Sequence, residues 1–219
     1  MRTRTVPGLL CGRVLVLALA LLAASAIPAA AQSPLATFGL KGGLTISTAS
    51  VELPEVEQQF GFVIDPDIRY GMLGGAFFGG PITGRIGWLG EFLVLQKGLK
   101  FDFFGLEEDI RLTYIEIPAL VQWSGPASGR IVPHVSAGPS FGFRVSEVQK
   151  EEGEDLNQPD QTDTFDFGLA FGGGVSFDKL VIDARFTVGL VNIAKPDQLG
   201  PNAEAHNRSF ALTVGWKFR

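Results

Sequence analysis

The sequence predicts an all-β protein: an eight-stranded antiparallel up-and-down transmembrane β-barrel, preceded by a cleaved signal peptide. Three observations support this fold class. Runs of residues alternate between apolar and polar side chains, which is the period of a strand with two different surroundings. The connections between these runs are alternately long and short, as in up-and-down barrels. The three tryptophans all lie on apolar faces, at one end of the proposed barrel.

The N-terminal segment, residues 1–31, is predicted to be a secretory signal peptide. It combines a basic start, a short apolar run and small residues before a cleavage site ahead of Gln32. These parts are, in order, Arg2, Arg4 and Arg13, residues 14–24, and residues 29–31. The apolar run is too short for a membrane-spanning helix. The outer-membrane β-barrel domain is therefore expected to occupy residues 32–219.

Cysteine usage and charge exclude several classes of function. Cys11 is the only cysteine and lies ahead of the apolar run, so the mature chain has no thiol for a disulfide or a cysteine metal site. Cleavage of the signal peptide leaves 15 basic and 23 acidic residues, a net charge of about −8. That balance argues against a nucleic-acid partner. We also expect no cofactor.

Alternation defines eight strands after the signal peptide. They are 36–48, 69–80, 86–100, 111–123, 131–146, 164–178, 180–192 and 206–218. The connections 49–68, 101–110, 147–163 and 193–205 are long, whereas 81–85, 124–130 and Asp178-Lys179 are short. Most strands are long enough to cross a bilayer at a tilt. Because the strand number is even, both chain ends are expected on the side of the short turns, which is the periplasmic side of an outer-membrane barrel.

The last strand shows the two faces most clearly. Phe210, Leu212, Val214, Trp216 and Phe218 lie on one face, and Ser209, Ala211, Thr213, Gly215 and Lys217 lie on the other. A charge facing lipid costs about 2–4 kcal/mol at the bilayer midplane, so the uncharged face is expected to face lipid. The tryptophans, with the last aromatic, are then expected to be interface anchors. These anchors are Trp88, Trp123, Trp216 and Phe218.

The opposite faces carry the charges that are expected to fill the lumen. They form a lumen charge network of five cations and four anions, namely Lys41, Glu91, Lys97, Glu116, Arg144, Asp166, Asp183, Arg185 and Lys217. Eight strands leave room for side chains and little else, so we expect these ions to pair. Leu93 and Leu95 are exceptions because they share the charged face of their strand. The glycine-rich run 69–80 leaves the faces of its strand unassigned.

Seven segments resemble the PorT-like outer-membrane β-barrel domain family. They are 39–44, 90–100, 114–123, 133–143, 166–177, 183–193 and 207–218. The most specific matches are E-F-L-x-x-Q-K-G, which starts at Glu91, and Y-x-E-I-P, which starts at Tyr114. The resemblance implies a small eight-stranded barrel that is integral to the bacterial cell outer membrane. It implies no single biochemical activity.

Two stretches are candidates for chemistry. His134 and Ser136 share a strand face and resemble the catalytic pair of outer-membrane lipid A deacylases, with Glu147 as an orienting carboxylate. Their face is the predicted lumen face, away from lipid, so we do not predict an enzyme. The acidic stretch 147–163 lacks the spacing and the turn glycine of a calcium loop, so a solvated acidic loop is favoured over a cation site.

The predicted function is that of a structural or interaction protein with a side-chain-filled lumen, which acts through its extracellular loops. The alternatives are a narrow pore for transport or a secretion-associated outer-membrane component, and a membrane lipid hydrolase that uses His134 and Ser136. The balanced charges of the lumen argue against a wide pore. Expected partners are the outer-membrane lipid bilayer, the barrel assembly machinery during biogenesis, and an unidentified extracellular or periplasmic protein.

Overall fold

The structure is a computed structural model that describes residues 37–52, 67–103, 106–151, 154–156, 162–195 and 202–218. The predicted signal peptide and its cleavage site lie outside the described residues, as does Arg219. Among the described residues, no helix is long and apolar enough to span a membrane.

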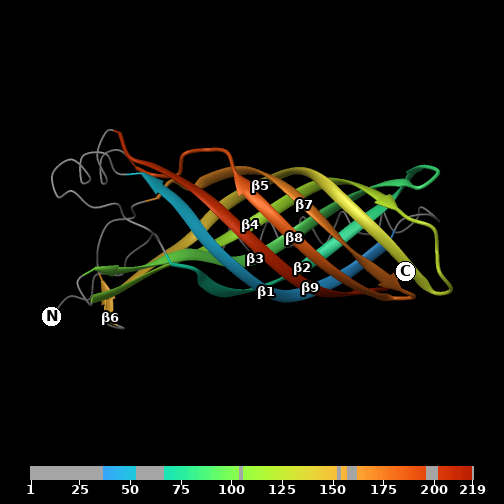
Figure 1. Cartoon of the computed structure of the whole chain (residues 1–219), viewed down its shortest axis with the longest axis horizontal. Coiled ribbons are helices and arrows are strands. Elements are labelled where there is room, and N and C mark those ends of the chain that lie inside the picture. The colour runs from blue at the N-terminus through green and yellow to red at the C-terminus, as the bar shows by residue number, and fades with distance from the viewer. Residues whose placement is uncertain are drawn as a thin grey trace, which may run out of the picture. The chain divides into compact units, whose positions relative to one another are not determined.

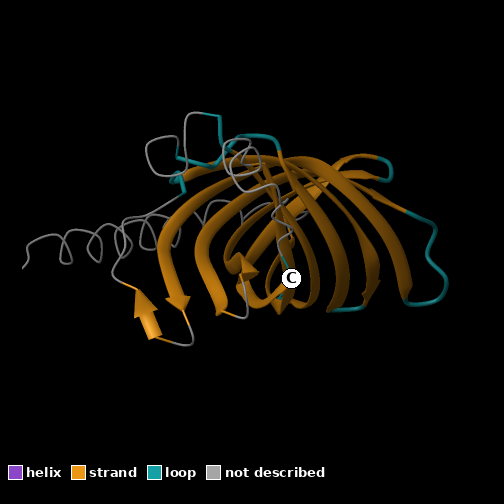
Figure 2. Ribbon diagram, turned by 60° about the vertical axis from the view of Figure 1, so that its left-hand side comes forward, coloured by secondary structure: helices purple, strands orange, loops and turns teal. Residues whose placement is uncertain are grey.

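Eight strands form the wall of a closed barrel, and a ninth short strand lies at one end. The wall strands are β1 (Thr37–Glu52), β2 (Arg69–Thr83), β3 (Ile86–Phe103), β4 (Leu106–Ser124), β5 (Ile131–Glu151), β7 (Phe165–Phe177), β8 (Leu180–Gly189) and β9 (Glu204–Lys217). Each pairs antiparallel with the next wall strand, and β9 pairs with β1 to close the circle (Figure 1). The predicted eight-stranded up-and-down barrel is therefore confirmed. Figure 2 shows the strands curving into one continuous wall.

Three tight turns define one end of the barrel, here called the turn end. Gly84-Arg85 joins β2 to β3, a short segment joins β4 to β5, and Asp178-Lys179 joins β7 to β8. Gly84 and Asp178 have φ values of 53° and 51°, the left-handed conformation that two-residue hairpin turns need. The start of β1 and the end of β9 lie at this end too. The opposite end is here called the loop end.

The prediction of a long third connection, 101–110, is wrong. β3 continues to Phe103 and β4 starts at Leu106, and the two strands stay paired over that whole length. The sequence hides this because the outward-facing residues Gln96, Thr113 and Arg111 are polar, so the apolar-and-polar alternation stops there. The strands continue past the apolar band of the barrel and therefore rise above the bilayer at the loop end.

The acidic stretch 147–163 is also more ordered than the sequence predicts. β5 extends to Glu151 instead of ending at 146, and β6 (Glu154–Leu156) pairs with its last three residues. The first part of the expected solvated loop therefore belongs to strands β5 and β6. Residues 152–153 and 157–161 lie outside the described residues.

The outer surface of the wall is an apolar band. Its most exposed members include Leu44, Met72, Val121, Val135, Phe171, Leu212 and Val214. Trp88, Trp123 and Trp216 lie on this outer surface near the turn end, with 41%, 46% and 51% of their surface exposed. Exposure of so many large apolar side chains is expected only where lipid, not water, surrounds them.

Aromatic pairs strengthen the band at the turn end. The rings of Phe78 and Trp88 meet edge to face, with 5.7 Å between centroids, and Phe38 and Phe218 lie 5.6 Å apart. Phe218 is half exposed beside the start of β1. Indole and phenyl rings at this level suit the region where lipid tails meet headgroups.

Candidate functional site

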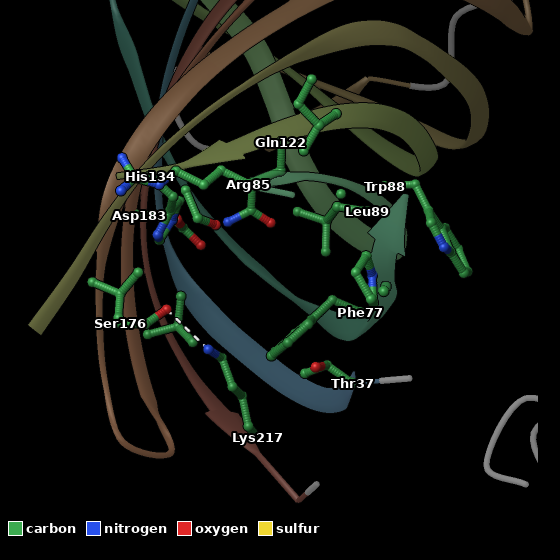
Figure 3. Close-up of a pocket in the computed structure, with 18 of the residues that line it drawn as sticks. Thr37, Phe77, Arg85, Trp88, Leu89, Gln122, His134, Ser176, Asp183 and Lys217 are labelled. Carbon is green, nitrogen blue, oxygen red and sulfur yellow. Dashed lines mark hydrogen bonds and ion pairs between the residues drawn. The ribbon is translucent and has the colours of Figure 1, made fainter. Parts of the chain in front are cut away.

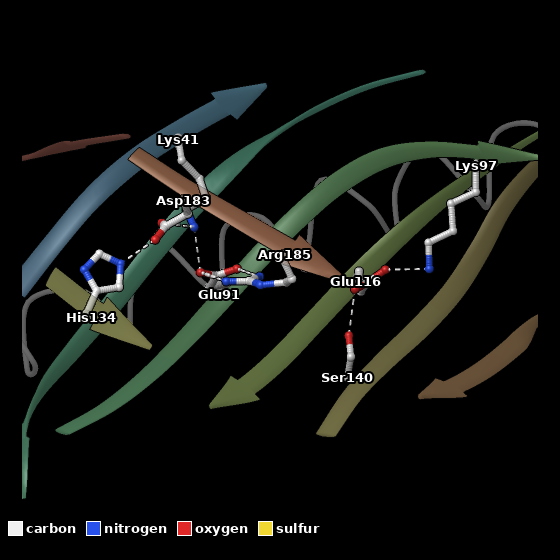
Figure 4. Close-up of polar contacts among 8 residues, drawn as sticks. All are labelled: Lys41, Glu91, Lys97, Glu116, His134, Ser140, Asp183 and Arg185. Atoms are coloured by element: carbon white, nitrogen blue, oxygen red, sulfur yellow. Dashed lines mark hydrogen bonds and ion pairs between the residues drawn. The ribbon is translucent and has the colours of Figure 1, made fainter. Parts of the chain in front are cut away.

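The candidate site is the lumen, because the structure places all nine charged residues of the predicted network on its inner face. Lys217 is partly buried, and the others are buried. Charges removed from water to this extent need partners close at hand. The contacts group most of them into two clusters, one nearer each end of the barrel (Figure 4).

The central cluster lies nearer the turn end and comprises Lys41, Glu91, Asp183, Arg185 and His134. Lys41 Nζ lies 2.8 Å from Glu91 and 3.2 Å from Asp183. Both terminal nitrogens of Arg185 bind the Glu91 carboxylate, which is the bidentate geometry that makes arginine pairs strong. Two cations thus meet two carboxylates, and every charge has an opposite neighbour.

His134 completes the central cluster, and it does not contact the carboxylate of the candidate catalytic arrangement that the sequence analysis set aside. Its Nε2 lies 2.5 Å from Asp183 Oδ1. Glu147, the orienting carboxylate of that alternative, lies 3.2 Å from the Arg144 guanidinium and accepts a 2.7 Å hydrogen bond from Thr162. His134 and Glu147 therefore belong to separate contacts, and the imidazole serves the lumen network.

The upper cluster lies nearer the loop end and is centred on Lys97. Lys97 Nζ lies 2.8 Å from Glu116 and 3.9 Å from Asp166. Ser140 Oγ donates a 2.7 Å hydrogen bond to Glu116, and Asn207 Nδ2 donates a 2.8 Å bond to Asp166. Ser140 thus binds the Glu116 oxygen that Lys97 does not contact, and Asn207 binds the Asp166 oxygen that faces Lys97.

An aromatic ring lies beside the lysine of each cluster. Lys41 Nζ lies 5.6 Å from the centre of the Phe77 ring, and Lys97 Nζ lies 5.2 Å from the centre of the Tyr114 ring. Phe77 has room to lie across the lumen because its neighbours on β1 and β9 are Gly39 and Gly215. Cation–π contacts of this kind stabilise a desolvated ammonium group.

Apolar side chains seal the lumen around the upper cluster. Their buried members are Ala49, Leu73, Leu93, Leu95, Ile110, Leu112 and Tyr114. Leu93 and Leu95 are thus inside, on the charged face to which the sequence assigns them. A cavity bounded by residues of both clusters measures only about 20 Å³, close to the space of one water molecule. The lumen is therefore packed at this level.

Side chains also organise the loop end. Asn192 Oδ1 accepts hydrogen bonds of 3.0 and 2.8 Å from the backbone N–H groups of Ala194 and Ala205, and its Nδ2 donates to Ala203. Ile193 is buried beside these alanines. Arg144 ties β5 to the segment before β7 through the carbonyl of Thr162, at 2.8 Å. Asn192 and Arg144 thus act as caps for the described parts of the loops.

The turn end differs because it holds a cavity of about 430 Å³, here called the vestibule (Figure 3). Lys41, His134 and Asp183 of the central cluster line its inner part. Lys217, held by a 2.9 Å hydrogen bond to Ser176, lines its wall. No group of three or more metal-ligating side chains occurs among the described residues.

Comparison with known protein families identifies the family of this chain. The model of the outer membrane protein beta-barrel domain matches residues 30–195, which is more than half of the chain. The chain belongs to this family. It is accordingly an integral β-barrel of the bacterial outer membrane, and by the rule for such barrels its turn end faces the periplasm and its loop end the cell exterior.

The chain is similar to solved structures of other outer-membrane barrels. OprG from Pseudomonas aeruginosa is 12% identical, with a TM-score of 0.52 over 84% of this chain and 97% of that chain. Neisserial surface protein A is 15% identical, with a TM-score of 0.49 over 84% and 99%. The attachment invasion locus protein Ail of Yersinia pestis, in complex with the heparin analogue sucrose octasulfate, is 14% identical, with a TM-score of 0.44 over 84% and 99%. No curated protein sequence matches this outer-membrane barrel significantly.

Several polar residues that line the lumen of this barrel were missed in the sequence analysis. Arg69 is buried in the lumen, but its glycine-rich strand gives no face assignment. Glu147 turns inward because the register shifts between Thr113 and Tyr114, which leaves Val145 as an extra residue on β5. Asn207 lies on the same face as Ser209 and Lys217, so its sequence position alone was a usable signal.

Proposed function

We propose that this outer-membrane barrel is a structural or interaction protein that acts through its extracellular loop end. The observation that carries the proposal is the packed lumen. Ion pairs, apolar side chains and two capping residues occupy the described interior, so the barrel wall serves as a rigid support for the strands that rise above the bilayer. Binding residues placed on loops over a rigid scaffold are a common arrangement.

A conductance experiment tests this proposal against a narrow pore. Folded mature protein is inserted into planar bilayers, and current is recorded at both voltage signs. We expect no stable conductance, because an ion would have to replace buried salt bridges at two levels. A steady, ion-selective conductance that persists in purified, fully folded protein would refute the packed-lumen proposal.

We further propose that the protein is not a lipid hydrolase. His134 Nε2 is engaged by Asp183, and His134 is buried within the lumen, away from the lipid face. The test compares the lipid A of cells that carry the natural chain, His134→Ala or Ser136→Ala, by mass spectrometry. We expect identical acylation in all three. Loss of one lipid modification in both variants would establish the hydrolase instead.

Membership of the narrower PorT-like group is proposed on the two most specific motifs. Glu91 and Lys97 come from E-F-L-x-x-Q-K-G, while Tyr114 and Glu116 come from Y-x-E-I-P. Their side chains meet in the lumen, where Lys97 binds Glu116 and lies over Tyr114. An alignment of PorT-like barrels tests this: the basic and acidic residues of the pair should occur together, and independent variation of the two positions would contradict it.

The partner at the cell exterior is proposed to present a basic surface. Glu204, Asp163 and Asp67 are exposed at the loop end, and the stretch 147–163 adds further acidic residues. Cross-linking on intact cells tests this, with the chain compared before and after Asp163→Asn and Glu204→Gln. We expect the double variant to capture less of a specific product, whereas Lys179→Gln at the periplasmic end should capture the same amount.

The barrel assembly machinery is the partner proposed for biogenesis. Phe218 is an exposed aromatic at the end of the last strand, which is the position that such machinery is expected to read. A Phe218→Ala variant should reach the outer membrane more slowly in pulse-chase fractionation, while Phe210→Ala on the same face should not.

A further inference from the structure

The periplasmic vestibule carries an excess of positive charge in a protein that is acidic overall. Four basic residues line it or its rim: Lys41, Arg85, Arg130 and Lys217. Asp183 and Asp178 are the carboxylates among its lining residues. The chain as a whole has 23 acidic and 18 basic residues, so this end reverses the general balance.

The pairing within the vestibule leaves two of these cations available. Lys41 binds Glu91 and Asp183 in the central cluster, and Arg130 lies 3.2 Å from Asp178 at the rim. Within the described part of the chain, no carboxylate lies within ion-pair distance of Lys217, whose Nζ donates only to Ser176. The Arg85 guanidinium likewise has no ion pair with a described residue.

We propose that the vestibule binds a small anion that bears phosphate or carboxylate groups, with Lys217 and Arg85 as its charge partners. The proposal goes beyond the extracellular role, because it concerns the opposite end of the barrel. Figure 3 shows Lys217, Arg85 and Gln122 among the residues around this cavity. The volume of about 430 Å³ lies within the usual range of small-molecule sites.

The chemistry of the lining residues selects an anion over a neutral ligand. Arg85 offers a planar fork of donors that matches a carboxylate or phosphate edge, and Lys217 offers a point charge across the cavity. Gln122 adds an amide that donates without charge. A partly enclosed cavity strengthens these attractions because less water screens them than on an open surface.

The test uses the full mature chain, folded in zwitterionic detergent at low salt, and titrates it with inorganic phosphate, pyrophosphate or citrate by calorimetry. We expect saturable binding of at least one of these anions. Lys217→Gln and Arg85→Gln should each weaken that binding by about tenfold, the effect of losing one charge-assisted hydrogen bond. Lys217→Arg, which keeps the charge, should bind like the natural chain.

Lys179→Gln is the matched control, because Lys179 is an exposed cation at the same end that does not line the vestibule. It should leave anion binding unchanged. Absence of saturable binding of all three anions overturns the proposal. Equal weakening by Lys179→Gln also overturns it, because the effect would then be general surface charge. Heat-modifiable gel mobility confirms that each variant is folded before it is titrated.

The anionic group could belong to a free solute or to a lipid headgroup, and nanodiscs distinguish the two sources. The anion among the three that binds in detergent is titrated into barrels held in phosphatidylcholine discs and in discs that also contain phosphatidylglycerol. If headgroups enter the vestibule, the anionic lipid should compete and weaken the binding of that anion to the natural chain. If the ligand is a free solute, the affinity should be the same in both discs. Either result supports the anion site. Absence of binding in both kinds of disc would contradict the proposal.

Discussion

Lys97 of β3 and Glu116 of β4 form an ion pair of 2.8 Å deep in the lumen, and Asp166 of β7 is the second carboxylate of the same lysine, at 3.9 Å. The upper cluster therefore contains one cation and two anions. Removing an anion leaves a balanced pair, whereas removing the cation leaves two carboxylates facing each other. The two variants should consequently differ in stability although they break the same contact.

We predict that Lys97→Met destabilises the barrel by about 3–5 kcal/mol, the usual effect of leaving buried charge without its partner. Glu116→Gln should be much milder, because Lys97 keeps Asp166 and the new amide oxygen still accepts from Ser140. Urea unfolding in detergent, followed by gel mobility, measures both. Lys179→Met at the exposed turn is the control and should stay within about 0.5 kcal/mol of the natural chain. Equal loss in the two lumen variants would contradict this account.

The central cluster gives a different prediction, because its charges are evenly matched. Glu91 is bound by both Lys41 and Arg185, so Glu91→Gln leaves two buried cations with only Asp183 between them. We expect a loss of about 3–5 kcal/mol from this variant. The double variant Glu91→Gln, Arg185→Gln should lose less than the sum of the two single variants, since each single variant leaves an unmatched charge. Strict additivity of the three unfolding free energies would show that the pair is not coupled.

Two adjacent glycines on β1 allow a sharp test of how closely β1 and β9 approach. A Cβ at Gly43 would overlap the backbone of Leu212 and lie 2.8 Å from the Cα of Thr213, whereas a Cβ at Gly42 would meet only the Leu73 carbonyl oxygen at 3.6 Å. Backbone atoms cannot move aside as a side chain can. We predict that Gly43→Ala folds poorly, and that Gly42→Ala folds like the natural chain, as judged by the heat-modifiable fraction. Normal folding of Gly43→Ala would show that β1 and β9 are less closely packed than the structure indicates.

The alternation of the sequence predicts much of the architecture and the inner face, because a closed barrel enforces period 2 wherever one face meets lipid. The inward placement of Lys41, Glu91 and Asp183 follows from that rule alone. The rule fails in the glycine-rich strand of Arg69, where too few side chains distinguish the two faces. It also fails at Glu147, because an extra residue in β5 exchanges the inward and outward positions that follow it. It also fails beyond the bilayer, where polar residues face outward and the apolar signal ends.

The pairing of the lumen charges lies beyond the sequence for another reason. His134 and Asp183 are 49 residues apart, and Arg185 and Glu91 are 94 apart, so they meet only across the lumen. Which charges meet depends on strand tilt and on the register of every pairing between them. A one-residue shift in any of these registers would change which side chains of the two strands lie opposite each other. Composition and spacing alone therefore predict which charges face the lumen, but not which of them pair.

The outward face gives a final prediction, because it separates a lipid-facing barrel from a barrel that binds ligands in water. Leu212 lies in the apolar band of β9 and is half exposed, and its neighbours across the strand pairs are Leu44 and Ala184. We predict that Leu212→Arg lowers the unfolding free energy in lipid by about 2–4 kcal/mol, because the guanidinium must enter the hydrocarbon region. Thr48→Arg, at the outer edge beside Arg208, should cost at most about 1 kcal/mol. Urea titration in phosphatidylcholine vesicles measures both, and equal stability of the two variants would mean that no lipid surrounds Leu212.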